Sequence, residues 1–425
     1  MRHIISSIAI SLSLVFAGST AMGAGFALYE FSARGNAMGG AVVANKAEAA
    51  SLAVNPALIT QIDGSQIQAG ATFVIPHSTT EVSGLPALGA ETKSELKNRV
   101  FVLPNIYATY QASENVFLGL AGFSRFGLGG EYKNADTWAG SAIAYKFDVL
   151  SYSLTPTIAA KVTDELSLAA GMEVMWLDFS EQKRLATTRI KVQGDGISWG
   201  GNLSAFYKPL WAEKWGFGFA YRTKTRHIVD GTADVNGTSS DVRGSVALPD
   251  SITFGASFAP TEKLTLEAGV VETFWSSYDA IRMEDFPTAG DLTVEEKYYK
   301  DVYRLNLGAE YALNNNWDLR AGYVFDKSPT NKDYMDTLVP VGDRHILNAG
   351  LGYKKDNWGI DFSYSYLIGK DMSGKTEFTY PNNPAFGPLA DTTVHPDMKY
   401  TNADTHMIGL TFKYAFGQHF LRGNK

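Results

Sequence analysis

The chain has 425 residues, a formal net charge of −7 at pH 7 and no cysteine. The missing cysteines exclude disulfide bonds and thiolate metal sites, and the acidic balance argues against a nucleic-acid partner, which usually needs a basic face. Hydrophobic residues make up 45% of the chain and aromatic residues 12%. No run of roughly 18 apolar residues follows the N-terminal segment, so we expect no transmembrane helix.

The first element is a secretory signal peptide, predicted over residues 1–23. A basic end at Arg2 precedes a moderately apolar, serine-containing stretch, and Ala21-Met22-Gly23 offers the small side chains that a signal peptidase requires. The stretch is too short to hold a helix across a bilayer. We therefore expect the mature, exported chain to start at Ala24.

Residues 24–64 form the second predicted element, a small plug (hatch). Glycines punctuate this segment, and an Ala-rich stretch favours a short helix. Asn55-Pro56-Ala57 suits a helix start, because the Asn side chain caps free amides and proline needs no amide partner there. The segment is too short to build its own core, so it must pack inside a larger structure. We expect Asn55, Pro56 and Ala57 to anchor it, although a cap with a purely structural role is equally consistent with these residues.

From residue 65 to residue 416 the chain alternates between apolar and polar side chains, as a strand with two different faces does. Phe362 and Tyr364 fall on one face, for example, and Asp361 and Ser363 fall on the other. In a soluble sandwich the apolar face packs on a second sheet, whereas in a membrane barrel it meets lipid. The length of the segments and their connections distinguish the two.

The segments favour the barrel, because about fourteen of them, of roughly 10–14 residues each, are long enough to cross a bilayer at a tilt. They centre near Ala71, Ile106, Leu120, Pro156, Gly171, Leu203, Phe219, Phe254, Leu266, Leu307, Ala321, Leu351, Phe362 and Leu410. Short polar turns alternate with long polar excursions over 77–98, 128–149, 180–196, 227–248, 277–300, 327–343 and 370–403. Loops sorted in this way are typical of outer-membrane barrels. We predict an all-β fold: a fourteen-stranded antiparallel transmembrane β-barrel over 65–416, with the plug in its lumen and a C-terminal tail over 417–425.

Charged residues on the polar faces would line the lumen of this barrel, where water or partners can satisfy them. For most of them we expect a structural ladder of ion pairs. The residues are Glu173, Arg222, Glu267, Arg304, Glu310, Asp318, Arg320 and Asp361.

Motifs in order along the mature chain resemble one family. They begin with Ala24-Gly-Phe-Ala-Leu-Tyr-Glu-Phe-Ser32 and Asn55-Pro56-Ala57, and continue with Leu248-Pro249-Asp250, Lys300-Asp-Val-Tyr-Arg304 and Trp317-Asp-Leu-Arg-Ala-Gly-Tyr323. This set resembles the long-chain fatty-acid transporters of bacterial outer membranes (FadL/TodX type), which include aromatic-hydrocarbon channels. The resemblance implies a monomeric, multi-pass protein of a Gram-negative outer membrane, in contact with its lipids and lipopolysaccharide. It also implies passive uptake of long-chain fatty acids or similar molecules; the alternative is uptake of uncharged aromatic or other hydrocarbon compounds. One departure is the tail after Phe416, where such barrels usually end on an aromatic residue.

The resemblance further implies a sideways exit through a gap in the barrel wall at a kinked third strand. In the third segment Gly122, Gly127 and Gly129 lack the side chains that stiffen a strand, so they can permit a kink; the alternative is that they only ease sheet curvature. Lys300 and Arg184 resemble the family's cations that meet the ligand head group, with Arg184 in the loop after the fifth segment. Each is also readable as a solvated surface charge.

The loops over 180–196 and 227–248 are expected to supply an outer landing groove, although their apolar content is thin. A membrane enzyme is the second class of function, but the sequence contains no H-E-x-x-H motif. A general porin is the third, and the plug argues against it. We expect no enzyme activity, no cofactor and no metal.

Overall fold

The computed structural model describes residues 25–85, 88–286, 290–340, 342–380, 388–390 and 392–416. The predicted signal peptide (1–23) and tail (417–425) lie outside these residues. Short helices precede the sheet: α2 (Ala33–Ala37), α3 (Ser51–Val54) and η1 (Pro56–Gln61). Others interrupt it: η2 (Ala139–Ala142), η3 (Leu210–Ala212) and η4 (Trp275–Ser277). No helix in the described part of the chain is both long and apolar enough to span a membrane.

The strands follow from residue 65 onward. In the first half they are β1 (Ser65–Ser83), β2 (Lys93–Glu95), β3 (Phe101–Gln111), β4 (Val116–Phe123), β5 (Gly127–Glu131), β6 (Lys146–Lys161), β7 (Leu166–Leu185), β8 (Thr188–Tyr207), β9 (Trp215–Arg222), β10 (Thr225–Val235) and β11 (Thr238–Leu248). In the second half they are β12 (Ser251–Phe258), β13 (Leu264–Thr273), β14 (Ala280–Phe286), β15 (Gly290–Glu296), β16 (Val302–Ala312), β17 (Trp317–Asp326), β18 (Arg344–Lys355), β19 (Trp358–Gly369), β20 (Met372–Lys375), β21 (Phe378–Thr379), β22 (Thr393–Val394) and β23 (Asp397–Phe416).

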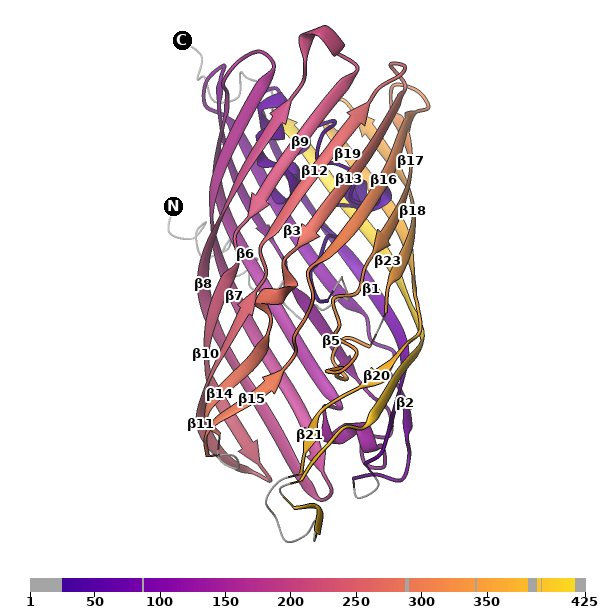
Figure 1. Cartoon of the computed structure of the whole chain (residues 1–425). Helices are drawn as coiled ribbons and strands as arrows, with labels where there is room; N and C mark the ends of the chain where they lie inside the picture. Colours follow the sequence, from indigo (N-terminus) through magenta and orange to yellow (C-terminus); the bar gives the residue numbers. More distant parts are fainter. Residues whose placement is uncertain are drawn as a thin grey trace, which may run out of the picture.

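These strands close into a barrel (Figure 1). In the described residues, neighbouring strands pair antiparallel around the ring, and β23 returns to pair with β1 from Ser65↔Phe416 onward. Within the described parts of the chain, seven of the fourteen barrel strands are broken in two, namely β2/β3, β4/β5, β9/β10, β11/β12, β13/β14, β15/β16 and β19/β20. Closure leaves no open sheet edge, which a sheet facing lipid could not tolerate. The predicted strand number and all fourteen predicted centres are confirmed.

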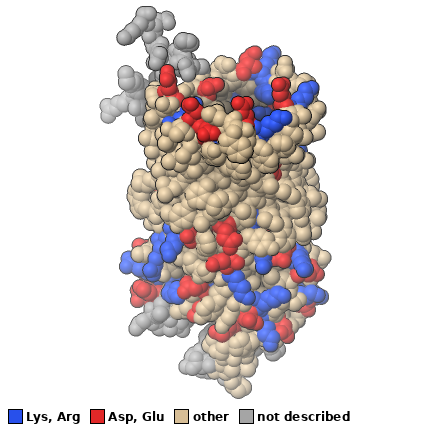
Figure 2. All heavy atoms as spheres, turned by 45° about the horizontal axis from the view of Figure 1, so that its top comes forward, with Lys and Arg blue, Asp and Glu red and all other residues tan. Residues whose placement is uncertain are grey.

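The outer face of the barrel is apolar. Phe362 and Tyr364 are exposed on this face, whereas Asp361 and Ser363, between them on β19, are buried in the lumen. Figure 2 shows a belt of largely uncharged surface between two ends that carry most of the charged side chains. Exposed aromatic residues lie where strands leave the belt, for example Trp317 beside a short turn, as expected at a membrane–water interface.

Several predicted loops are wrong in the structure, because strands extend well beyond the belt. The stretch 180–196 is mostly the β7–β8 hairpin, whose turn is only Ala186-Thr187, and 227–248 is mostly the β10–β11 hairpin. Arg184 is therefore a strand residue of β7 and not a loop residue. Polar residues on both faces of these extensions hid the alternation, since neither face needs to be apolar once the strands have left the lipid.

Residues 25–64, which we call the hatch, pack inside the barrel near its short turns (Figure 1). Backbone amides of Val43 and Ala44 both donate to Glu267 Oε1, at 2.5 and 3.1 Å. Strand glycines allow the hatch backbone to touch the wall: a Cβ added at Gly218 would collide with the carbonyl oxygen of Val43, and one at Gly322 with the amide of Gly39. At these positions the hatch backbone therefore lies in direct contact with the wall.

Ion pairs run around the wall beside the hatch, as the sequence predicted. Arg320 bonds Glu310 at 2.7 Å and Asp361 at 2.6 Å, all three nearly fully buried. Glu310 also binds two hatch cations, Arg34 at 2.9 Å and Lys46 at 2.7 Å. The ladder thus fixes the hatch to β16 as well as joining strands to one another.

Candidate functional site

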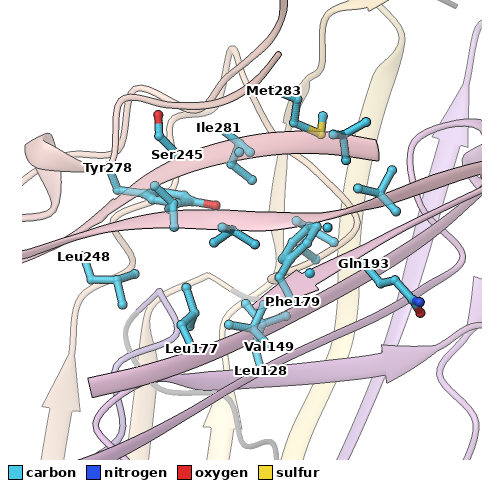
Figure 3. Close-up of a pocket in the computed structure, with 18 of the residues that line it drawn as sticks. Leu128, Val149, Leu177, Phe179, Gln193, Ser245, Leu248, Tyr278, Ile281 and Met283 are labelled. Carbon is cyan, nitrogen blue, oxygen red and sulfur yellow. The ribbon is translucent and has the colours of Figure 1, made fainter. Parts of the chain in front are cut away.

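An apolar cavity lies in the long-loop half of the barrel, and we call it the loop-side cavity. Its volume is about 60 Å³, above the roughly 10–15 Å³ that one water needs. Side chains from opposite walls converge on it in Figure 3. The lining includes Phe26, Leu128, Val149, Leu177, Phe179, Val192, Val229, Val242, Val246, Leu248, Tyr278, Ile281, Met283 and Leu338.

Several of these side chains come from the stretches that were predicted to form an outer landing groove. Val192, Val229 and Val246 instead point inward and line the loop-side cavity. Their thin apolar content is sufficient there, because alternation aims every second residue of a hairpin at the same cavity. These stretches therefore contribute to an internal cavity, and the outer landing groove stays a prediction.

A second cavity of about 60 Å³ lies against the hatch, and we call it the hatch cavity. Its lining mixes apolar side chains with two arginines and several hydroxyl groups. It includes Ala27, Leu28, Tyr29, Phe31, Val54, Arg125, Phe126, Ala220, Arg222, Ser251, Thr253, Val271 and Thr273. Arg125 Nη1 bonds Glu173 Oε2 at 3.2 Å, and Arg222 Nη1 lies 3.8 Å from the same oxygen.

The N-terminal end of the hatch separates the two cavities. Ala27 forms an antiparallel bridge with Phe126, the Leu28 amide donates to the Arg125 carbonyl, and the Gly127 amide donates to the Phe26 carbonyl, both at 2.9 Å. On either side of these contacts, Phe26 and Leu128 line the loop-side cavity, whereas Ala27 and Phe126 line the hatch cavity. Residues 26–28 and 126–128 together form the partition.

The third strand is interrupted at this partition. Strand β4 pairs with both β3 and β6, whereas β5, after the break at residues 124–126, pairs with β6 and has no pairing with β3 in the described residues. Gly122 lies near the end of β4, Gly127 begins β5, and Gly129 lies within β5 opposite Asp148. The predicted glycines thus flank the break, and their role in an opening stays a prediction.

The two predicted cations do not line either cavity. Lys300 is exposed between β15 and β16, and its side chain forms no ion pair among the described residues. Arg184 pairs with Asp136 at 3.4 Å. Their role toward a head group also stays a prediction.

Two lysines that the sequence analysis missed lie in one cluster of charges: Lys297, which is buried, and Lys183, which is partly buried. Lys297 Nζ bonds Asp336 at 2.9 Å and lies 3.6 Å from Glu295, while Lys183 pairs with Glu181 and Glu295. Burial alone would lower the pKa of Lys297, but the carboxylates of Asp336 and Glu295 outweigh it and hold the pKa well above its usual value. Two lysines share three carboxylates, so this cluster offers a ligand no free positive charge.

Asn55, Pro56 and Ala57 begin η1 as the sequence predicted. The Asn55 side chain accepts from the Ala57 amide at 3.1 Å, and its Nδ2 donates to Val43 O at 2.7 Å and to Ala205 O of β8 at 3.0 Å. Pro56 occupies the first turn. All three are buried and make these contacts within the hatch or to the wall, outside the lining of both cavities.

A closed barrel with an apolar belt, an internal hatch and a largely apolar internal cavity defines an outer-membrane channel protein. The model of the outer membrane protein transport family (OMPP1/FadL/TodX) matches residues 14–416. The chain belongs to this family, so it is an outer-membrane transport protein for hydrophobic molecules and not an enzyme.

Relatives match over nearly their whole length. A long-chain fatty acid transport protein of Escherichia coli is 25% identical, with 97% of this chain and 98% of that protein covered. A FadL homologue of Pseudomonas aeruginosa aligns with a TM-score of 0.80 at 18% identity, over 92% of this chain and 99% of that one. The toluene transporter TodX of Pseudomonas putida aligns with a TM-score of 0.68 at 17% identity, over 92% and 99% of the chains. At these identities the two structures show the shared fold.

Proposed function

We propose that this protein admits long-chain fatty acids or similar hydrophobic molecules passively, and that they leave sideways through the barrel wall at the third strand. The observation that carries the proposal is the interrupted ladder at residues 124–126. It adjoins both cavities, since Phe126 lines one and Leu128 the other. A break in backbone pairing is where a barrel wall is weakest.

A filled lumen supports the sideways route over an axial one. The hatch touches the wall at Gly218 and Gly322 with no room for even a methyl group. An axial path would require the hatch to leave its buried ion pairs with Glu310, whereas a lateral path begins where the wall already lacks hydrogen bonds.

Unpaired polar atoms beside the break agree with a local opening. Asn105 of β3 and Ser124 at the break are buried, and the side-chain polar atoms of both have no hydrogen-bond partner in the described residues. Closing the wall therefore leaves these groups unsatisfied, which costs free energy.

The apolar lining of the loop-side cavity supports a hydrophobic ligand, and a relative is named for long-chain fatty acids. The alternative ligand class is uncharged aromatic or other hydrocarbon compounds. It is favoured by one observation: among the described residues that line the loop-side cavity, none is a cation. We further propose that Lys300 and Arg184 act outside this cavity if they meet a head group, and that the protein works as a monomer surrounded by lipid and lipopolysaccharide.

Uptake by intact cells tests the proposal. Cells that lack their own transporter would express the wild type, Ser124→Trp to fill the break, or Ser113→Trp as a control in the turn before β4. We expect the wild type and the control to raise uptake of labelled oleate or toluene, and Ser124→Trp to lose most of the gain. No gain with the wild type would reject the function; full activity of Ser124→Trp would reject the lateral route.

A further inference from the structure

The two arginines of the hatch cavity carry more positive charge than their surroundings neutralise. Arg125 and Arg222 form ion pairs with only one carboxylate among the described residues, that of Glu173. The other oxygen of Glu173 accepts from Ser153 at 2.6 Å. All three side chains are at least nine-tenths buried. A buried positive charge in excess costs free energy unless an anion pairs with it.

Of the two arginines, Arg222 is the one whose guanidinium group lacks a hydrogen-bond partner. Arg125 donates to Glu173 and to the carbonyl oxygens of Thr223 and Pro249, each at 3.0 Å. Arg222 donates from Nη2 to Leu52 O at 2.8 Å, but its Nη1 has no hydrogen-bond partner in the described part of the chain. A guanidinium suits a carboxylate because it presents several N–H groups in a fixed fork.

The other residues that line the hatch cavity indicate the chemistry of the rest of the ligand. Leu28, Phe31, Ala220 and Val271 surround the arginines with apolar surface, and Ser251 and Thr253 add hydroxyl groups. A small inorganic anion would leave this apolar surface in contact with water. A molecule with an anionic end and an apolar body satisfies both parts of the lining.

We infer that the hatch cavity is a second ligand site, in which Arg222 and Arg125 bind the carboxylate of an apolar acid. The inference deepens the proposed function and rests on it, because a hydrophobic ligand must first enter the barrel. The loop-side cavity accepts acids and uncharged molecules alike, and the hatch cavity distinguishes them. An uncharged analogue of the acid leaves Arg222 Nη1 without a charged acceptor.

The experiment compares laurate with lauryl alcohol on the full-length protein in an uncharged detergent. Isothermal titration calorimetry gives the ratio of the alcohol's Kd to the acid's Kd. In Arg222→Met we expect this ratio to fall about tenfold or more, because a charge-assisted hydrogen bond is lost. Arg222→Lys, which keeps the charge, should recover part of the preference. Lys46→Met, which removes a hatch contact to Glu310 away from the cavity, serves as the matched control and should not change the ratio.

Cross-linking locates the site independently of any change in hatch stability. A laurate analogue with a diazirine beside the carboxyl group should label peptides that contain Ala220 or Ser251 in the wild type. Labelling confined to the loop-side cavity, or an unchanged ratio in Arg222→Met, would overturn the inference while leaving the proposed function intact. If neither probe binds the wild type, the proposed function fails and takes the inference with it.

Discussion

The two cavities have similar volumes but are built in opposite ways. Barrel strands supply almost all of the loop-side lining, its side chains are mostly apolar, and the nearby lysines are already neutralised. The hatch supplies much of the other lining, and its arginines outnumber their acid partner. The two neighbouring cavities therefore differ in their electrostatic environment, although they do not differ in volume. A ligand that passes from one to the other moves from a site without charge selection into one that recognises an anion.

Loss of Glu310 should give the largest effect and should break the hatch cavity alone. Glu310→Ala leaves Arg34, Arg320 and Lys46 without their shared carboxylate, and removing one partner of a buried pair costs about 3–5 kcal/mol. We expect lower resistance to denaturant and new ion conductance in planar bilayers, while toluene still binds. Glu284→Ala, at an exposed position of β14, is the control. If Glu310→Ala were as stable as the wild type, Glu310 would not be the residue that holds the hatch in place.

Loss of Lys297 should instead loosen one wall of the loop-side cavity. Asp336, its partner, accepts from the amides of Leu338 and Val339, and Leu338 lines the cavity. In Lys297→Met we expect amide exchange of residues 330–340 to accelerate about tenfold or more. Lys300→Met, an exposed neighbour, should exchange like the wild type, and equal rates in both variants would refute the role.

The pH dependence of this contact follows from the raised pKa of Lys297. The folded state holds this proton more tightly than the unfolded chain does. The stabilisation is therefore fully present below the pKa of an unfolded lysine and is lost only as the pH rises through the higher folded value. Exchange of 330–340 should show no step attributable to Lys297 between neutral and mildly alkaline pH.

Filling the loop-side cavity should affect both ligand classes equally. Val242→Trp places a large side chain in the space between β11 and the opposite wall, and we expect the affinities for laurate and toluene each to fall about tenfold. Ile228→Trp, on the outward face of the paired strand, is the control. A selective loss of laurate binding would show that this cavity already recognises the carboxylate.

Arg243→Ala should have the smallest effect. Arg243 bonds Asp230 at 2.7 Å on the exposed side of the β10–β11 hairpin, opposite the cavity-lining valines. Exposed pairs are screened by water and contribute little. We expect binding of both ligands to match the wild type; a clear change would mean that the outer side of the hairpin also contacts ligand.

The sequence predicted the barrel because alternation acts residue by residue. Tyr364 faces lipid and Asp361 faces the lumen for a reason visible within one segment. The arginine pair was not visible in this way: Arg125 and Arg222 are far apart in the chain, and only closure of the barrel brings both to Glu173. Arg222 was identified as a lumen charge, but no spacing reveals how many acids it meets. The head-group prediction for Lys300, in contrast, rested on resemblance, and Lys300 lies outside both cavities.

The glycines beside the hatch have a consequence for biogenesis. Since the wall at Gly218 and Gly322 lies against the hatch backbone, a finished cylinder would leave this segment little clearance at these positions. The first and last strands, β1 and β23, also bond it directly, through Thr72 to Asn36 and Thr411 to Ala33. We therefore expect the hatch to be in place before β1 and β23 pair and close the barrel, so that the wall assembles around it.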